Sequence, residues 1–256
     1  MPPRIPTEED LTSLPLPLSV HFPSPPESTT AILVLLHGFG DSAASFINFA
    51  RNMELPGVLT VAVRGTAPLP PSILPPGADE DRHFHWGDDV QIDQSTGDIA
   101  ADPGFEKAVS PIMDVLIKGC LVEKFGWEPE DVILFGFGQG GSLALGLASR
   151  FANPRVVDVE GGAEGGKFKG VVSVGGPLPP SMVSTLSGRR KSKTKALIVQ
   201  VRGADKDYVE EEFESVKSVE WKREEVDTPR NREEMYPIMA FLGELLGEPQ
   251  PVFGQI

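Results

Sequence analysis

The apolar residues of this chain fall into short continuous runs, separated by longer segments of helical periodicity. The run at 31–36, Ala-Ile-Leu-Val-Leu-Leu, is too short for most helices and too continuous for a half-exposed strand, so it predicts a buried strand. Further strands are expected at 58–63, 131–135, 170–174, 196–201 and 218–222. Strands that alternate with helices are typical of a mainly parallel sheet covered on both faces. We therefore predict the α/β class, with a doubly wound, mainly parallel sheet.

Helices are expected at 42–52, 103–125 and 139–150, and in a C-terminal stretch that ends near Leu246. Pro237 falls within this last helix and should either kink it or delay its start, because proline lacks a backbone N–H. No long linker interrupts residues 30–247, which we expect to form a single domain. A proline-rich N-terminal arm with the first strand precedes the domain at 1–29, and a tail follows it at 248–256.

Composition narrows the classes of partner. The 256 residues are 40% apolar, which is enough for a sizeable core, and the net charge of −14 disfavours nucleic acid and anionic membranes as partners. A single cysteine, Cys120, excludes an internal disulfide and suits a reducing compartment. No stretch approaches the roughly 20 apolar residues that span a bilayer.

The expected location follows from the N-terminal residues and from one basic run. Residues 1–10 lack the apolar region of a signal peptide, so we expect a cytoplasmic protein. The basic run at 188–195 stands out in an acidic chain, and a solvated loop is its default interpretation. A nuclear signal or a contact with an anionic ligand is the alternative.

The most informative motif is Gly136-Phe137-Gly138-Gln139-Gly140, between a predicted strand and a predicted helix. Serine hydrolases place the pattern G-x-S-x-G at such a junction, where a sharp turn exposes the serine at the top of the sheet. Gly136 and Gly140 match the flanking glycines, but Gly138 has no side chain. Because the middle position costs a non-glycine residue about 1–3 kcal/mol, glycine relieves strain there and removes the nucleophile. A glycine-rich turn of a nucleotide-binding fold is the alternative interpretation.

A second loop, Leu-His-Gly-Phe-Gly-Asp-Ser at 36–42, directly follows the first buried strand. In serine hydrolases with such an elbow, an amide from this loop joins the amide that follows the nucleophile, and together they hold a developing oxyanion. Phe39 and Gln139 would supply these two amides here. As a sequence signal this loop is moderately specific alone, and it becomes more specific because the glycine-rich elbow follows it about 100 residues later.

Four segments place the chain beside a known family. They are Leu-His-Gly-Phe-Gly-Asp at 36–41, Arg-Gly-Thr-Ala-Pro at 64–68, His-Trp-Gly-Asp at 85–88 and Gly-Phe-Gly-Gln-Gly-Gly at 136–141. In this order they resemble the acyl-protein thioesterases and carboxylesterases of the α/β-hydrolase fold, along residues 30–246. The resemblance implies hydrolysis of carboxylic esters or thioesters, including palmitoyl groups on proteins, without a cofactor.

The family's chemistry needs a nucleophile, then an acid, then a histidine base in chain order. All four histidines of this chain precede the elbow, so the order is not satisfied; they are His21, His37, His83 and His85. The resemblance places the nucleophile at Gly138, the acid at Lys206 and the base at Thr228. All three positions are therefore altered.

Two details of these positions predict structure. Asp205 and Asp207 flank Lys206, and a loop shift of one residue would bring either carboxylate into the acid position. Thr228 is followed by Pro229, which predicts the start of a helix, because a threonine cap and a proline at the first helical position both favour one.

A relocated nucleophile is the alternative to a lost one. Ser142 follows the elbow by one turn, Ser173 lies in a predicted strand, and Cys120 lies near the end of a predicted helix. None of the three has a recognisable base, and serine at its free pKa is a weak nucleophile. Ordinary packing roles are the simpler interpretation.

An apolar pocket is expected beside the elbow. By resemblance, the proline-rich stretch 67–76 lies where the family has its acyl-channel loops, so Leu69, Ile73 and Leu74 should line a pocket together with His37 and Trp86. The P-x-x-P spacing in the same stretch is also what aromatic grooves of SH3 type bind, and such docking is the alternative.

A metal site is a second hypothesis for the neighbouring segment. His83 and His85 would point the same way on an extended chain, and Asp88 follows closely, so the three could hold a divalent ion. The other interpretation is a pocket-covering loop, with Trp86 as an apolar wall and Asp88 as a loop hydrogen-bond partner. We expect this second interpretation, and neither a metal nor a cofactor.

The sequence thus predicts an α/β-hydrolase fold that has lost its hydrolytic residues. We expect such a protein to bind an acyl chain or lipid, or to present a surface to a protein partner. The alternative is an active ester or palmitoyl-protein thioester hydrolase that uses a relocated nucleophile.

Overall fold

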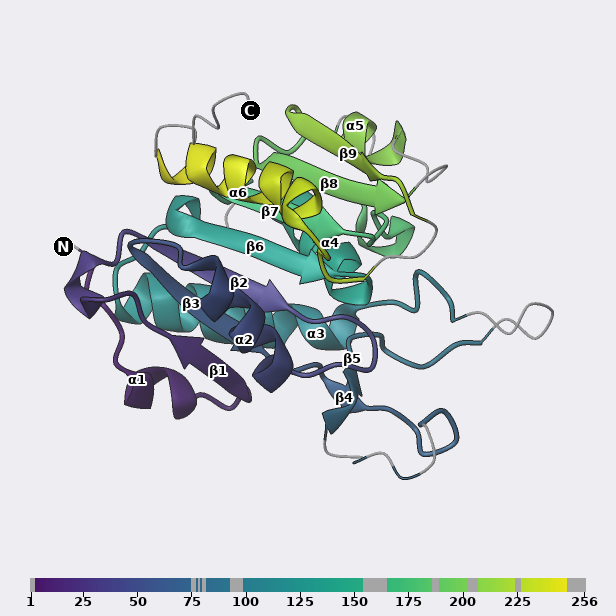
Figure 1. Ribbon diagram of the computed structural model, residues 1–256, viewed down its shortest axis with the longest axis horizontal. Helices are drawn as coiled ribbons and strands as arrows, with labels where there is room; N and C mark the ends of the chain where they lie inside the picture. Colours follow the sequence, from purple (N-terminus) through teal and green to yellow (C-terminus); the bar gives the residue numbers. More distant parts are fainter. Residues whose placement is uncertain are drawn as a thin grey trace.

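The computed structural model describes residues 3–74, 77, 79, 82–92, 99–153, 165–185, 189–201, 207–223 and 227–247. Its centre is a seven-stranded sheet in the order β1-β3-β2-β6-β7-β8-β9 (Figure 1). The strands are β1 (Leu18–His21), β2 (Ala31–Leu36), β3 (Val58–Val63), β6 (Val132–Phe137), β7 (Gly170–Val174), β8 (Lys195–Val201) and β9 (Val216–Trp221). All neighbours are parallel except β1, which runs antiparallel to β3.

The strand order reverses between β2 and β6. The chain first adds β3 on one side of β2, and β6 then pairs with the other side, so that Leu36 lies opposite Gly136 at the carboxyl ends. In open α/β sheets such a reversal leaves a crevice outside the strand ends, where ligands bind. The two motif loops found in the sequence, after β2 and after β6, therefore meet at this switch point.

Helices cover both faces of the sheet (Figure 1). One face packs against α2 (Ala43–Met53) and α6 (Arg232–Leu246) through Leu33, Leu35 and Phe135 among others. The other packs against α3 (Glu106–Ser110), η3 (Pro111–Lys124) and α4 (Gln139–Ala152). Every residue of β2, β3 and β6 is buried, as expected for central strands with two covered faces.

Smaller elements complete the described part of the chain. They are α1 (Glu8–Thr12), η1 (Pro26–Ser28), β4 (Ala67–Pro68), β5 (Phe84–His85), η4 (Pro129–Asp131), η6 (Pro180–Met182) and α5 (Asp207–Glu212). β4 and β5 pair as a two-stranded sheet, beyond the carboxyl ends of β2 and β6 in Figure 1. No helix among the described residues is long and apolar enough to cross a membrane.

The predicted α/β architecture is confirmed, with corrections inside two helices. The helix predicted at 103–125 begins at Glu106 and becomes a π-helix from Pro111. In the last turn of this π-helix, the amide of Phe125 donates to the carbonyl of Cys120. Periodicity does not distinguish this from an α-helix. The expected delay of the last helix by Pro237 is wrong, because α6 begins at Arg232, with Asn231 as its N-cap, and contains the proline.

Candidate functional site

Gly138 keeps the backbone of a nucleophile elbow without the nucleophile. It lies between β6 and α4 with φ 48° and ψ −118°, and its amide donates to the carbonyl of Val174 over 2.8 Å. Only glycine adopts such a conformation without strain, which is about 1–3 kcal/mol for other residues. A methyl group built at this position would meet no atom within 4 Å. The elbow therefore has open space where a serine side chain would project.

The glycines around Gly138 are required for packing. A methyl group at Gly136 would overlap the carbonyl of Gly140, and one at Gly140 would overlap the carbonyl of Leu36. One at Gly176, after β7, would overlap the carbonyl of Gly138. The elbow is thus pressed against the ends of β2 and β7, and glycine at these three positions allows that approach.

The two predicted oxyanion donors keep free amides. In the part of the chain that the structure describes, the amides of Phe39 and Gln139 have no acceptor. The loop that carries Phe39 is fixed from outside, because the amide of Gly40 donates to the carbonyl of Phe84 over 2.9 Å and the amide of Phe84 donates to Asp41 over 3.1 Å. The loop is therefore positioned before any ligand binds.

His37 is a structural residue in this arrangement. Its side chain is fully buried, and its Nε2 accepts the amide of Gly65 over 2.8 Å. Nε2 therefore carries no proton, and Nδ1–H donates to the carbonyl of Gly38 over 2.7 Å. Burial lowers the pKa of His37 and keeps the ring neutral. With both nitrogens occupied, this imidazole is not available as a base.

Trp86 joins the oxyanion loop to the elbow. It is fully buried beside His37, with ring centres 5.0 Å apart, and its indole N–H donates to the carbonyl of His37 over 2.8 Å. Its own amide donates to the side-chain oxygen of Gln139 over 2.7 Å. The sequence did not predict this role for the Gln139 side chain or for Gly65, because both depend on contacts between distant segments.

The remaining residues predicted for the pocket lie on the β4 side of the site. Leu69 is buried, and a methyl group at Gly40 would touch it at 3.4 Å, so Leu69 packs on the oxyanion loop. Ile73 and Leu74 are half-buried. Their place in an acyl pocket stays a prediction.

His83 and His85 are not brought together as metal ligands. His83 pairs through Nδ1 with the carbonyl of Gly40 over 2.7 Å. Asp88 accepts the amide of Lys107 over 2.8 Å and so caps the start of α3. The described residues contain no group of three side chains that could hold a metal. Asp88 therefore has the loop-binding role that the second interpretation gave it.

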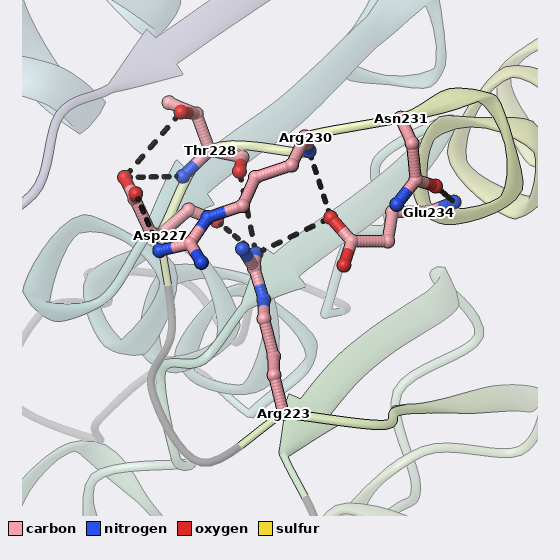
Figure 2. A network of polar contacts seen from close by, with 6 residues as sticks. All are labelled: Arg223, Asp227, Thr228, Arg230, Asn231 and Glu234. Atoms are coloured by element: carbon pink, nitrogen blue, oxygen red, sulfur yellow. Dashed lines mark hydrogen bonds and ion pairs between the residues drawn. The ribbon is translucent and has the colours of Figure 1, made fainter.

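The loop predicted to correspond to the family's base carries an ion-pair network (Figure 2). Thr228 is exposed, and its amide and hydroxyl donate to Asp227 over 2.7 and 3.3 Å. Arg223 stacks on Trp221 and donates to the carbonyls of Asp227 and Thr228 over 2.7 and 3.3 Å. It also lies 3.6 Å from Glu234 of α6. The loop is held in place by charge, with no imidazole in the network.

Two predictions about this loop and the acid have different outcomes. The helix start predicted at Thr228 and Pro229 is wrong, because Asn231 accepts the amide of Glu234 and caps α6 three residues later. Lys206 and Asp205 lie outside the described residues. Asp207 is the first residue of α5.

The three alternative nucleophiles have structural roles. Ser142 is buried in the first turn of α4, and the Ser173 hydroxyl donates to the carbonyl of Gly176 over 2.8 Å. Cys120 is buried in the core, and this burial raises the pKa of its thiol, so the reactive thiolate is disfavoured. The structure thus pairs none of them with a histidine among the described residues.

A sequence profile of the phospholipase/carboxylesterase family matches residues 20–236. The chain belongs to this family. The match includes the oxyanion loop, the Trp86 segment and the elbow.

Individual relatives are similar in sequence or in fold. The chain is 31% identical over 151 residues to an uncharacterized hydrolase of Schizosaccharomyces pombe, and 32% identical over 148 residues to one of Mycosarcoma maydis. These alignments cover 59% and 54% of this chain, and 55% and 53% of the relatives, so the match spans about half the length of each relative. Among solved structures, acyl-protein thioesterase 2 of Zea mays has a TM-score of 0.62 at 22% identity, covering 90% of this chain and 99% of that one. At this identity the likeness shows a shared α/β-hydrolase fold.

Proposed function

We propose that this member of the family does not hydrolyse esters and instead binds an acyl or lipid ligand at the switch point of its sheet. The observation that carries the proposal is Gly138, which retains the elbow conformation and the open space but offers no atom that can attack a carbonyl. A covalent acyl intermediate cannot form without a nucleophile. The free amides of Phe39 and Gln139 would still bind a carbonyl or an anionic oxygen.

The histidines support the same conclusion. His37 uses both ring nitrogens in the scaffold, and His83 holds the oxyanion loop. His21 lies on the edge strand β1, opposite Thr60 of β3, and two strands separate it from β6, which carries the elbow. Only His85 remains near the site, and Ser142 and Ser173 are both buried in other contacts. An oxyanion site alone accelerates hydrolysis over water by about 10³–10⁴, far below useful turnover.

A fluorophosphonate probe tests the proposal, because it labels only activated serines. We expect the wild type to remain unlabelled by intact mass spectrometry, and its rate on p-nitrophenyl butyrate to match a buffer blank. Gly138→Ser should also remain inactive, because the new hydroxyl has no base to remove its proton. A serine esterase that labels fully under the same conditions is the positive control.

The opposite result has a clear meaning. Stoichiometric labelling of the wild type, mapped to one peptide, would identify a relocated nucleophile and overturn the proposal. A lipid extract of the purified protein tests the binding half: a copurifying acyl compound is expected. An empty protein that also takes up no acyl compound when incubated with one would favour a protein partner instead.

A further inference from the structure

His85 has a polar atom with no partner beside the site. The residue is 4% exposed, and its Nδ1 is buried without a hydrogen bond to any described residue. A buried polar atom left without a partner costs about 1–3 kcal/mol. This cost is removed when a bound molecule supplies the missing hydrogen bond.

The contacts of the chain around His85 place it between the two halves of the site. The residue before it, Phe84, pairs with Asp41 of the oxyanion loop. The residue after it, Trp86, donates its amide to Gln139 of the elbow over 2.7 Å. The His85 ring itself lies 6.2 Å from the ring of Phe39, the first oxyanion residue.

The elbow offers positive charge and space at the same point. α4 is 14 residues long, its first turn contains no acidic side chain, and its first amide, on Gln139, has no acceptor in the described chain. The start of such a helix attracts anions through its free amides and its dipole. Above Gly138 there is open space that a serine side chain would otherwise fill.

These observations rest on the proposed function and extend it to the chemistry of the ligand. We propose that the site binds a free carboxylate, with His85 as its charge-compensating partner. One carboxylate oxygen would accept from the amides of Phe39 and Gln139, and the other would use the space above Gly138 and the hydrogen bond of His85. An ester or amide carbonyl has only one such oxygen and no charge.

The electrostatic surroundings of His85 are compatible with an anion. Burial lowers the pKa of His85 and so favours the neutral ring in the empty site, while the charged groups that act on it among the described residues are Asp89 and Lys107, one of each sign. An anion beside the ring would favour its protonated form. Neither side chain is hydrogen-bonded to Nδ1 of the ring, so the imidazole has no fixed counter-ion in the described chain. A bound carboxylate would supply one.

Isothermal titration calorimetry with two probes of equal length tests the proposal. Octanoate carries the carboxylate, and octanamide keeps the carbonyl and the chain but has no charge. Because hydrogen bonds to charged groups are stronger than neutral ones, we expect octanoate to bind the wild type about tenfold more tightly than octanamide. Equal affinities would overturn the proposal.

Two variants locate the binding. His85→Gln should weaken octanoate about tenfold and reduce its advantage over octanamide to about one, since it removes the compensating imidazole. Gly138→Ala should weaken octanoate by at least that factor, because its methyl group fills the space for the second oxygen. His21→Gln, on the edge strand β1 and separated from β6 by two strands, is the matched control and should bind as the wild type does.

The outcomes separate this inference from the proposed function. If His85→Gln, shown by circular dichroism to be folded, binds octanoate like the wild type, His85 is not the partner and the inference fails, while the absence of hydrolysis stands. If the wild type hydrolyses p-nitrophenyl butyrate, the proposed function fails whatever the probes show. A tenfold preference that persists in both variants would mean that octanoate binds elsewhere, which also overturns the inference.

Discussion

Gly138 and Gly140 are two residues apart, yet the structure requires glycine at them for different reasons. At Gly138 the requirement is conformational, since φ is 48° while a side chain has open space. At Gly140 it is steric, since a methyl group would overlap the backbone carbonyls of Leu36 and His37. Backbone atoms at the end of a central strand cannot move aside as a flexible side chain can. The two glycines should therefore respond differently to the same substitution.

We predict that Gly140→Ala is the more destabilising change. It should lower the free energy of unfolding by about 3 kcal/mol or more, because overpacking against a rigid backbone forces the elbow away from β2. Gly138→Ala should cost about 1–3 kcal/mol, the strain of its backbone conformation. Urea denaturation followed by circular dichroism measures both. Gly243→Ala in α6, where a methyl group meets nothing within 4 Å, is the control and should stabilise by up to about 1 kcal/mol. An equal cost at 138 and 140 would contradict the steric argument.

At the residue scale, the sequence predicted the glycines of the elbow, but it did not predict the hydrogen bonds that hold the elbow and its neighbouring loops in place. The glycines at 136, 138 and 140 were recognisable because their spacing is local, and the conformation expected at Gly138 is what the structure has. The partners of His37 and the side-chain bond of Gln139 could not be predicted, since they join residues 28 and 53 positions apart. That no histidine follows the elbow can be read directly from the sequence, because it needs only the count and order of the histidines.

The buried contacts of His37 connect three elements at the switch point. His37 lies at the end of β2. Its ring accepts a hydrogen bond from the amide of Gly65 after β3, and its backbone carbonyl accepts one from the indole N–H of Trp86 after β5. These bonds require the neutral ring, because a protonated Nε2 would present a second N–H to the Gly65 amide. The arrangement of the elements is therefore linked to pH.

We predict that stability falls as the pH is lowered through the range of histidine. Burial lowers the pKa of His37 in the fold, so below its ordinary value of about 6.5 the unfolded chain binds more protons and is favoured. The free energy of unfolding should decrease from pH 7.5 to pH 5.5, and His37→Gln should show a shallower decrease. His21 and His85, whose pKa values burial also lowers, account for part of the slope that remains.

Trp86→Phe is the matched control for this experiment. It removes the hydrogen bond to the carbonyl of His37 and should destabilise the protein at every pH, but it leaves the titrating ring in place. Its pH slope should therefore equal that of the wild type. If His37→Gln had the wild-type slope as well, the ring would not be the linked group.

At the element scale, hydrophobic periodicity predicted where the helices and strands lie better than it predicted the kind of helix. The six strands were predicted within about two residues at each end. A continuous apolar run shows where a strand lies, but it does not fix the residues at which the strand begins and ends. The π-helix at Pro111–Lys124 was not predicted, since its apolar residues also fit an α-helix. The short elements α5, β4 and β5 were missed, because a few residues carry too little pattern.

At the scale of the whole molecule, the sheet brings together loops from distant parts of the chain. The elbow, the oxyanion loop and the Trp86 segment are joined by hydrogen bonds at the switch point, and the family profile spans all three. The fold is thus preserved in a chain that has glycine at the elbow and no histidine after it. Fold and chemistry are separable here, because packing depends on glycines and apolar residues and catalysis on a few side chains.

This separability makes a prediction about restoring the chemistry. If the loop of Thr228 occupies the base position, Gly138→Ser combined with Thr228→His should react with a fluorophosphonate faster than either single variant. The acid can be omitted: in one serine protease its loss alone cost about 3 × 10⁴ in rate, against about 2 × 10⁶ for the nucleophile or the base. We therefore expect the double variant to react about 10–100-fold faster than Gly138→Ser.

The control for the double variant is Gly138→Ser with Thr228→Gln, which has a side chain of similar reach but cannot accept the proton as a base. Labelling rates are compared by intact mass spectrometry at pH 7.5, where a histidine of ordinary pKa is mostly neutral. Equal rates for the histidine and glutamine variants would show that residue 228 does not reach residue 138. The ion-pair network that fixes the loop through Arg223 and Glu234 would then be what holds it away, and adding Arg223→Met should release it and raise the rate of the histidine variant alone.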